Sequence, residues 1–154
     1  MSLQVRKAHA LDAPAILHCL SAAFEVYRSQ YTPQAYSDTV LDSETLRRRM
    51  TEMSVLVAIS DGEVVGTISY SVHGHQGHVR GMAVLPHWHG AGVASELLKR
   101  VEAELLISGC SRVTLDSTQP LQRAIRFYER NGFAASGRLT DFFGMQLHEF
   151  AKLL

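Results

Sequence analysis

Residues 84–94, VLPHWHGAGVA, join a strand-like run to the start of an amphipathic helix. The strand-like run ends at Pro86, and Gly90 and Gly92 stand directly before the helix. Glycines between a strand and a helix let the backbone approach a ligand closely, and that ligand is often a phosphate. The stretch therefore predicts a phosphate-binding turn.

Two common phosphate-binding motifs do not match this turn. A P-loop requires GxxxxGK[ST], but Gly92 is followed by Val93 and Ala94. A Rossmann fingerprint requires a third glycine where this chain has Ser95, and the preceding strand follows hairpins instead of opening a βαβ unit. A simple helix cap would explain one glycine, but not two separated by a single residue.

The composition narrows the class of protein. Hydrophobic residues make up 46% of the 154 residues and charged residues 19%, values typical of one soluble globular domain. Lys+Arg and Asp+Glu number 15 each, so no overall basic field favours nucleic acid or a membrane surface as a partner. Cys19 and Cys110 are predicted to be reduced, buried thiols. With no apolar leader and no long apolar run, the sequence predicts a cytoplasmic protein.

The pattern of apolar residues predicts a single α/β (α+β) domain over residues 1–154, with a central mixed sheet flanked by helices. Asp12 is the expected N-cap of a first helix that ends near Arg28, and a loop is expected over residues 29–38. In one strand, alternate residues from Val64 to Val72 are expected to share a face. The expected strands are 3–8, 54–60, 63–72, 78–84, 112–117 and 145–154, and the further helices start near Ser43, follow Gly92 to Gly109, and run from Leu121 to Gly132.

Two blocks of sequence carry a family resemblance. The run V-x-P-x-x-x-G-x-G-V-A, residues 84–94, resembles motif A of the GNAT superfamily of N-acetyltransferases. The run AIRFYERNGF, residues 124–133, resembles motif B of that superfamily and lies at the expected distance downstream. The resemblance implies the GNAT acyl-CoA N-acyltransferase fold, acetyl-CoA as cosubstrate and an amine as acceptor.

The resemblance also assigns roles to residues around the glycine turn. The backbone of Met82, Ala83 and Val84 would hold the pantetheine arm of acetyl-CoA. Free amides and the positive end of the helix dipole would hold the pyrophosphate. The residues that supply these groups would be His89, Gly90, Ala91, Gly92, Val93, Ala94 and Ser95. A Cβ at either glycine would block the cofactor.

Acetyl transfer to an amine requires a neutral amine, donors for the developing oxyanion and an acid for the departing thiolate. The family resemblance assigns the acid to Tyr128, although Tyr128 also shares an apolar stripe with Leu121 and Ala124 and could be a core residue. His78 has a suitable intrinsic pKa for the base, with Asp116 on the next strand, and a water relay is the alternative. Cys110 follows a helix-ending glycine, so no covalent nucleophile is expected.

The acceptor site is expected in two variable regions. In the family, the segment after the first helix and the last hairpin wall this site, which here points to Tyr27, Arg28, Tyr31 and Phe142. Such a wall would suit a small polar amine or a peptide N-terminus, and the tyrosines are equally compatible with a core role. The basic run over residues 47–49 is interpreted as a solvated helix face.

Alternative functions remain open at this point. His89 and Leu121 replace the Arg or Gln and the Asn that are common in the family, which keeps a non-catalytic acyl-CoA binding or sensing module in consideration. His73, His75 and His78 could suggest a metal site, but no cysteine or carboxylate completes the set, so no metal is expected. Edge strands near the C-terminus could pair in a homodimer.

Overall fold

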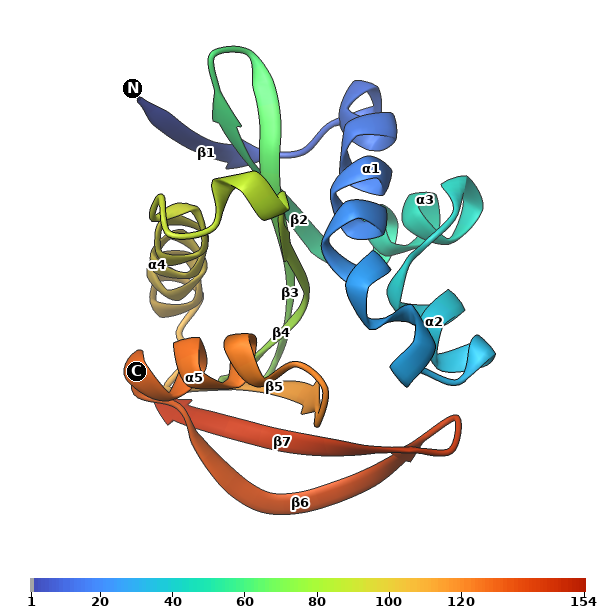
Figure 1. Cartoon of the computed structure of the whole chain (residues 1–154). Helices are drawn as coiled ribbons and strands as arrows, with labels where there is room; N and C mark the ends of the chain where they lie inside the picture. Colours follow the sequence, from blue (N-terminus) through green and yellow to red (C-terminus); the bar gives the residue numbers. More distant parts are fainter. Residues whose placement is uncertain (1) are drawn as a thin grey trace.

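The computed structural model describes residues 2–154, in which seven strands form one sheet in the order β1-β2-β3-β4-β5-β7-β6 (Figure 1). The strands are β1 (Leu3–Lys7), β2 (Ser54–Ser60), β3 (Glu63–His73), β4 (Gln76–Val84), β5 (Arg112–Thr118), β6 (Ala134–Phe142) and β7 (Met145–Leu153). The helices are α1 (Ala13–Phe24), α2 (Pro33–Thr39), α3 (Ser43–Glu52), α4 (Val93–Ile107) and α5 (Gln122–Arg130). Three 3₁₀ turns, η1 (Ala10–Asp12), η2 (Glu25–Gln30) and η3 (Pro86–Trp88), link them within this range. The predicted mixed α/β architecture is confirmed.

The pairing of β4 with β5 positions the site. All other neighbouring strands are antiparallel, whereas β4 and β5 are parallel and joined by α4, as a parallel pair requires a crossover. Their pairing begins at Gln76–Arg112 and ends at Val79–Leu115. Beyond that pair both strands continue unpaired with each other, so the sheet opens into a gap between the ends of β4 and β5.

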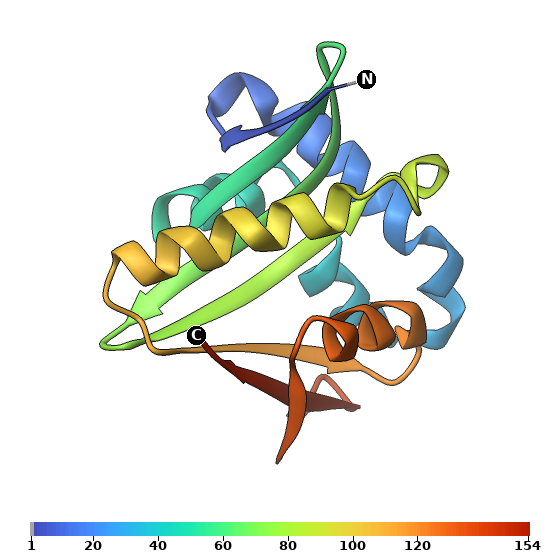
Figure 2. The ribbon, with the colours of Figure 1, turned by 90° about the vertical axis from the view of Figure 1, so that its left-hand side faces the viewer.

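Helices cover both faces of the sheet. Helix α4 lies across one face, while α1 and α3 pack on the other (Figures 1 and 2). The predicted amphipathic stripe of α4 is confirmed, because Leu97, Leu98, Val101 and Leu105 are all buried against the sheet. Each fully buried leucine or valine contributes roughly 1.5–3 kcal/mol, so this stripe fixes α4 and the turn before it.

The alternation predicted for β3 holds only in its middle. Ile68 and Tyr70 belong to the core beneath α4, and the Tyr70 hydroxyl donates to Glu104 of that helix at 2.9 Å. At the start of the strand a register shift opposite Ala58 and Ile59 places an extra residue in β3, and Val65 is fully buried. At the other end Val72 is 39% exposed, because the strand there runs out into the hairpin turn.

The N-terminal third contains two corrections. Residues 33–39 form α2 instead of a loop, because Pro33 is compatible with the first helical turn and the Thr32 hydroxyl accepts the Ala35 amide at 3.3 Å. Asp12 stands at the N-cap position of α1 but does not cap that helix. Its carboxylate accepts the His9 amide at 2.9 Å and pairs with Arg6 at 2.8 Å, and the hydrogen bonds from Arg6 lower the pKa of Asp12 to about 2.

Other expectations were met or refined. Helix α1 ends at Phe24, and the chain continues to Gln30 as the 3₁₀ turn η2. Cys19 and Cys110 are free and buried, as predicted, and burial raises the pKa of Cys19 to about 12. Strand β6, which was not bounded in advance, pairs with β7 as a C-terminal hairpin. Among residues 2–154, no helix has the length and apolar character that crossing a membrane requires.

Candidate active site

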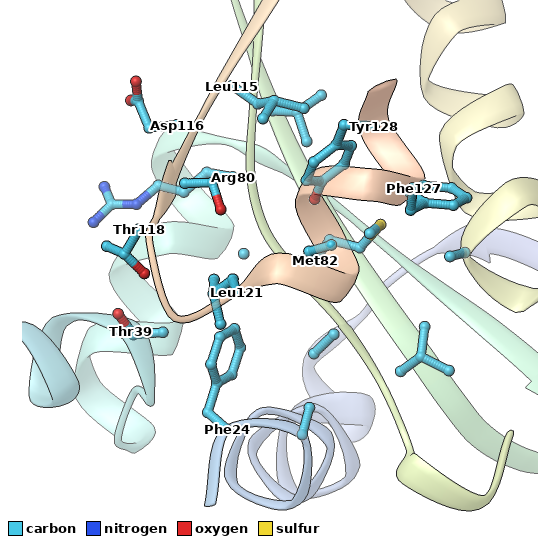
Figure 3. Close-up of a pocket in the computed structure, with 18 of the residues that line it drawn as sticks. Phe24, Thr39, Arg80, Met82, Leu115, Asp116, Thr118, Leu121, Phe127 and Tyr128 are labelled. Atoms are coloured by element: carbon cyan, nitrogen blue, oxygen red, sulfur yellow. The ribbon is translucent and has the colours of Figure 1, made fainter. Parts of the chain in front are cut away.

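A cavity of about 1160 Å³ opens where β4 and β5 separate (Figure 3). Its walls come from both ends of the chain: η2, α2 and α3 on one side, and α5 with the β6–β7 hairpin on the other. The glycine turn and the first turn of α4 form one end of the cavity. All of the predicted cofactor and acceptor residues except Arg28 and Ala91 therefore line one space, although they are distant in the sequence.

The glycine turn is held open by its backbone conformation. Gly90 and Gly92 have φ angles of +80° and +84°, a region that side-chain-bearing residues rarely adopt. A Cβ built on either glycine meets no other atom within 4 Å. The chain itself leaves this space free, so the turn can receive a ligand there and a side chain would intrude on it.

Free amide donors face this end of the cavity. The first intrahelical bond of α4 runs from the Glu96 amide to the Gly92 carbonyl at 3.0 Å. The amides of Val93, Ala94 and Ser95 therefore have no carbonyl partner within the helix, and no side chain caps them. Together with the positive end of the helix dipole they suit an anion such as a pyrophosphate.

Positive charge near the turn comes from α5 rather than from His89. Arg123 of α5 lines the cavity and lies close enough to act on His89. Burial, reinforced by the charge of Arg123, lowers the pKa of His89, so the imidazole is neutral at pH 7. Arg123 can thus supply the charge that an arginine at position 89 commonly supplies in the resembled family.

The end of β4 presents backbone groups to the gap. The Leu85 amide donates to the Val65 carbonyl at 2.9 Å, and Val84 lies opposite Gly66. Because backbone groups alternate in direction along a strand, the amide and carbonyl of Val84 point away from β3 and into the gap. A register shift between Thr67 and Ser69 marks a bulge at this point of β4. Met82, Ala83 and Val84 all line the cavity, where an extended arm could add to the strand edge.

Tyr128, the predicted acid, lies on α5 among aromatic rings at the wall of the cavity. Its ring packs edge-on against Phe127 and Phe133, with centroids 5.6 and 5.7 Å away, and the residue is 7% exposed. The hydroxyl points from α5 towards Met82 of β4 (Figure 3) and has no hydrogen-bond partner among the described residues. Burial raises the pKa of this phenol above its usual value, so it stays protonated and able to donate.

His78 lies at the edge of the cavity, one residue before the gap begins. Its Nδ1 is 2.8 Å from the Thr114 hydroxyl, and its Nε2 is 3.5 Å from Asp116 Oδ2. The imidazole thus contacts a hydroxyl on one side and a carboxylate on the other, and the carboxylate of Asp116 favours a proton on the Nε2 that faces it. Burial lowers the pKa of His78, partly offset by Asp116, and burial raises the pKa of Asp116.

The predicted acceptor residues divide into two groups. Tyr27, Tyr31 and Phe142 line the cavity, and the Tyr31 hydroxyl is 2.6 Å from the Thr118 hydroxyl across the mouth of the gap. Arg28 does not line the cavity; its guanidinium lies 4.8 Å over the Tyr36 ring on the outside of this wall. Ala91, between the two glycines, is likewise outside the lining.

Sequence reasoning missed one charged residue of the cavity wall. Arg47 and Arg48 are exposed, but Arg49 is only 8% exposed and lines the cavity, so the interpretation of this run as a solvated face is wrong for Arg49. A signal was available, because Arg49 follows the buried Leu46 by three residues and therefore shares its helix face.

Comparison with known proteins agrees with this geometry. The family model described as acetyltransferase (GNAT) family matches residues 15–133. The fold resembles the PaiA N-acetyltransferase of Thermoplasma acidophilum in complex with coenzyme A, with a TM-score of 0.86, 17% identity and full coverage of both chains. It also resembles the ribosomal-protein-S18-alanine N-acetyltransferase of Escherichia coli (TM-score 0.77, 16% identity, covering 99% of this chain and 94% of that one). The ribosomal-protein-alanine N-acetyltransferase of Brucella melitensis is similar too (TM-score 0.76, 24% identity, covering 98% and 99%).

The matched region contains both the glycine turn and Tyr128, and the free amides and open strand edge fit coenzyme A. The chain therefore belongs to the acetyltransferase (GNAT) family, and it is an acetyltransferase that uses acetyl-CoA.

Proposed function

We propose that this protein transfers the acetyl group of acetyl-CoA to a primary amine by direct attack, with both substrates bound together. The unpartnered Tyr128 hydroxyl carries this proposal, because it faces the same cavity as the free amides of α4 and the open edge of β4. Bound acetyl-CoA would supply the thioester. The amine nitrogen forms a bond to the carbonyl carbon, the carbon–sulfur bond breaks, and the sulfur receives a proton.

The residues of the cavity meet the three demands of this reaction. The Val84 amide, directed into the gap, is placed to donate to the carbonyl oxygen as negative charge develops. Tyr128 donates its phenolic proton to the departing sulfur. His78, neutral at pH 7 because burial lowers its pKa, accepts the proton of the incoming ammonium through water.

Binding of the cosubstrate is the first test. We expect calorimetric titration to show micromolar affinity for acetyl-CoA and CoA in the wild type and none in Gly92→Glu, because the new side chain would occupy the open space and place a negative charge among the phosphate donors. Gly109→Glu is the matched control. Gly109 ends the same helix with a φ of +85° and no atom within 4 Å of an added Cβ, so it carries the same strain and charge at the opposite end of α4.

The two variants make the result decisive. Loss of binding in Gly92→Glu but not in Gly109→Glu would locate the cofactor at the glycine turn. A folded wild type that binds neither ligand would contradict the proposal.

Turnover separates the enzyme from a binding module. Release of free CoA thiol in the presence of an amine panel would be expected of the enzyme, whereas a sensing module would bind acetyl-CoA without release. Two of the similar structures are named as acetyltransferases of a ribosomal-protein alanine. The panel should therefore contain short peptides with free N-termini as well as small amines.

A further inference from the structure

Arg49 of α3 is a buried cation without a partner. Its exposed fraction is 8%, yet no hydrogen bond or ion pair connects its guanidinium to another residue in 2–154. Burial is the largest influence on this side chain and lowers its pKa to about 10, so it remains charged at neutral pH. A charge withdrawn from water without a partner is strongly unfavourable, and such groups in proteins are normally paired.

The bulge in β4 makes room for this guanidinium. Gly81 has a φ of +67°, and a Cβ at that position would lie 2.5 Å from Arg49 Nη1. The charged head of Arg49 therefore lies against the backbone of Gly81, on the part of β4 beyond Val79 that is not paired with β5. Both Arg49 and Gly81 line the cavity, so the free donors of the guanidinium are accessible from it.

The neighbouring charges do not neutralise Arg49. Asp38 of α2 is the nearest carboxylate to act on it, but Asp38 is already paired with Arg80 at 2.6 Å. The charge of Arg80 also disfavours the charged form of Arg49. This part of the cavity therefore offers one uncompensated positive charge, close to the place where acetyl transfer is proposed.

We propose that Arg49 binds a carboxylate of the acceptor, so that the amine acetylated here is a small amino acid that carries a free carboxylate close to its amino group. The inference rests on the proposed acetyl transfer to an amine. A carboxylate fits better than a phosphate dianion, because the one uncompensated charge of Arg49 balances a single negative charge. The carboxylates of Asp38 and Asp116 in the same wall would repel a dianion.

The arrangement also orients such a substrate. Arg49 would hold the carboxylate beside Gly81, and the ammonium would lie along β4 between the acetyl position and the His78–Asp116 pair. The wall contributed by Tyr27, Tyr31 and Phe142 would then contact the substrate side chain. Diamines and polyamines carry no carboxylate for Arg49, so this arrangement favours amino acids over them.

The test compares amino acids with their primary amides as acceptors. Each pair keeps the amine and side chain but removes the carboxylate charge, and pairs with apolar, aromatic and polar side chains would be used. In the wild type we expect kcat/KM to favour the acid. In Arg49→Met we expect the acid-to-amide ratio to fall by about 30-fold or more, the usual consequence of removing one partner of a buried charge pair. Comparing ratios cancels the different amine pKa values of acid and amide.

Two controls separate binding from a structural role. Arg48→Met changes an exposed arginine of the same helix and should leave the ratio unchanged. Arg49→Met should retain affinity for CoA and a melting temperature no lower than the wild type, since an unpaired buried charge is removed. Equal losses for acid and amide, with a lowered melting temperature, would show that Arg49 only supports α3 and would overturn the proposal.

A binding measurement makes the result independent of turnover. The Arg49 Nε–H resonance, assigned by its absence from the Arg49→Lys spectrum, should shift when the CoA-bound protein is titrated with amino acids but not with their amides. Acetylation of amides or polyamines with an unaltered ratio in Arg49→Met would refute the carboxylate site and leave the acetyltransferase proposal standing. Absence of any turnover would refute the proposed function, and the titration would still decide what Arg49 binds.

Discussion

At the scale of single residues, the site uses polar groups that the fold leaves unsatisfied. The Tyr128 hydroxyl and the amides of Val93 to Ser95 lack partners among the described residues, and all of them face the same cavity. Buried polar groups are normally hydrogen-bonded, because an unmade bond costs about 1–3 kcal/mol. Because these donors open to the cavity, they are available to a ligand bound there, which supports the proposed site.

The role of Tyr128 can be tested by removing one atom. We expect Tyr128→Phe to lower kcat by about 10²–10⁴-fold, the range for loss of a positioned acid. The affinity for CoA should hardly change, because the ring and its contacts with Phe127 and Phe133 remain. Steady-state kinetics with a fixed amine, together with calorimetry, would measure both quantities.

Tyr70→Phe is the control for this substitution, since the Tyr70 hydroxyl bonds to Glu104 of α4 outside the cavity. Unchanged turnover in Tyr128→Phe would mean that water protonates the sulfur. A phenol is a weaker acid than a thiol, and burial raises the pKa of Tyr128 further. Proton transfer from Tyr128 to the sulfur therefore requires that the same dry surroundings also make the thiolate more basic.

The residue scale also shows what sequence can and cannot predict. The glycine turn was recognisable because its spacing is local and its conformation depends on the residues themselves. Arg49 differs from Arg47 and Arg48 in sharing a helix face with Leu46, but this spacing does not show that the face is covered; the packing of α3 on the sheet buries it. Arg28 was expected in the acceptor wall, but η2 turns its side chain over Tyr36 instead.

At the scale of elements, the gap between β4 and β5 positions the predicted base. The last paired residues are Val79 and Leu115, so His78 and Asp116 stand on either side of the start of the gap on neighbouring strands. The hydrogen bond between His78 and Thr114 fixes the imidazole against β5. Any displacement of the two strands would therefore move the base relative to the opening of the gap.

The proposed base predicts a particular pH dependence. Because burial lowers the pKa of His78, the imidazole is protonated, and inactive as a base, only below its ordinary pKa of about 6.5. The plot of log kcat/KM against pH should therefore bend on the acidic side, with activity falling as pH decreases through the lowered value. Asp116 raises the pKa of His78, so Asp116→Asn should move this bend to a lower pH.

The bend itself should disappear in His78→Gln, with kcat/KM above pH 7 about 100-fold lower than in the wild type. His75→Gln is a matched control, because His75 lies in the β3–β4 turn, bonds to the Gly109 carbonyl and is not part of the cavity lining. If the bend persists in His78→Gln, another group titrates there, and His78 is not the base.

Element boundaries were predictable where a local signal existed. Strand β2, strand β5 and helix α4 follow from short apolar runs and a clear helical period. The sequence predicts a loop in place of α2 because the seven residues of this helix show little periodicity, although Thr32-Pro33 is a helix start signal. Strand β6 carries few buried residues, since it lies at the edge of the sheet and pairs only with β7.

At the scale of the whole molecule, the cavity is a consequence of topology. Its walls combine η2, α2 and α3 from the first third of the chain with the β6–β7 hairpin at the end. Thr32 donates to the Phe143 carbonyl at 2.8 Å and so joins the two walls directly. Contacts between residues this far apart have no counterpart in local sequence patterns, which is why the acceptor site could be assigned only by resemblance.

A ligand that fills the gap should stabilise the entire domain. Coenzyme A at about 100 times its dissociation constant contributes roughly 2.7 kcal/mol, and each kcal/mol raises the melting temperature of a domain of this size by about 2–4 °C. We therefore expect calorimetry to show an increase of roughly 5–10 °C for the wild type and none for Gly92→Glu. 3′-Phosphoadenosine 5′-diphosphate, which is coenzyme A without the pantetheine arm, should give a smaller increase at the same concentration. Equal increases in melting temperature for both ligands would mean that the open edge of β4, and with it the gap between β4 and β5, contributes nothing to binding.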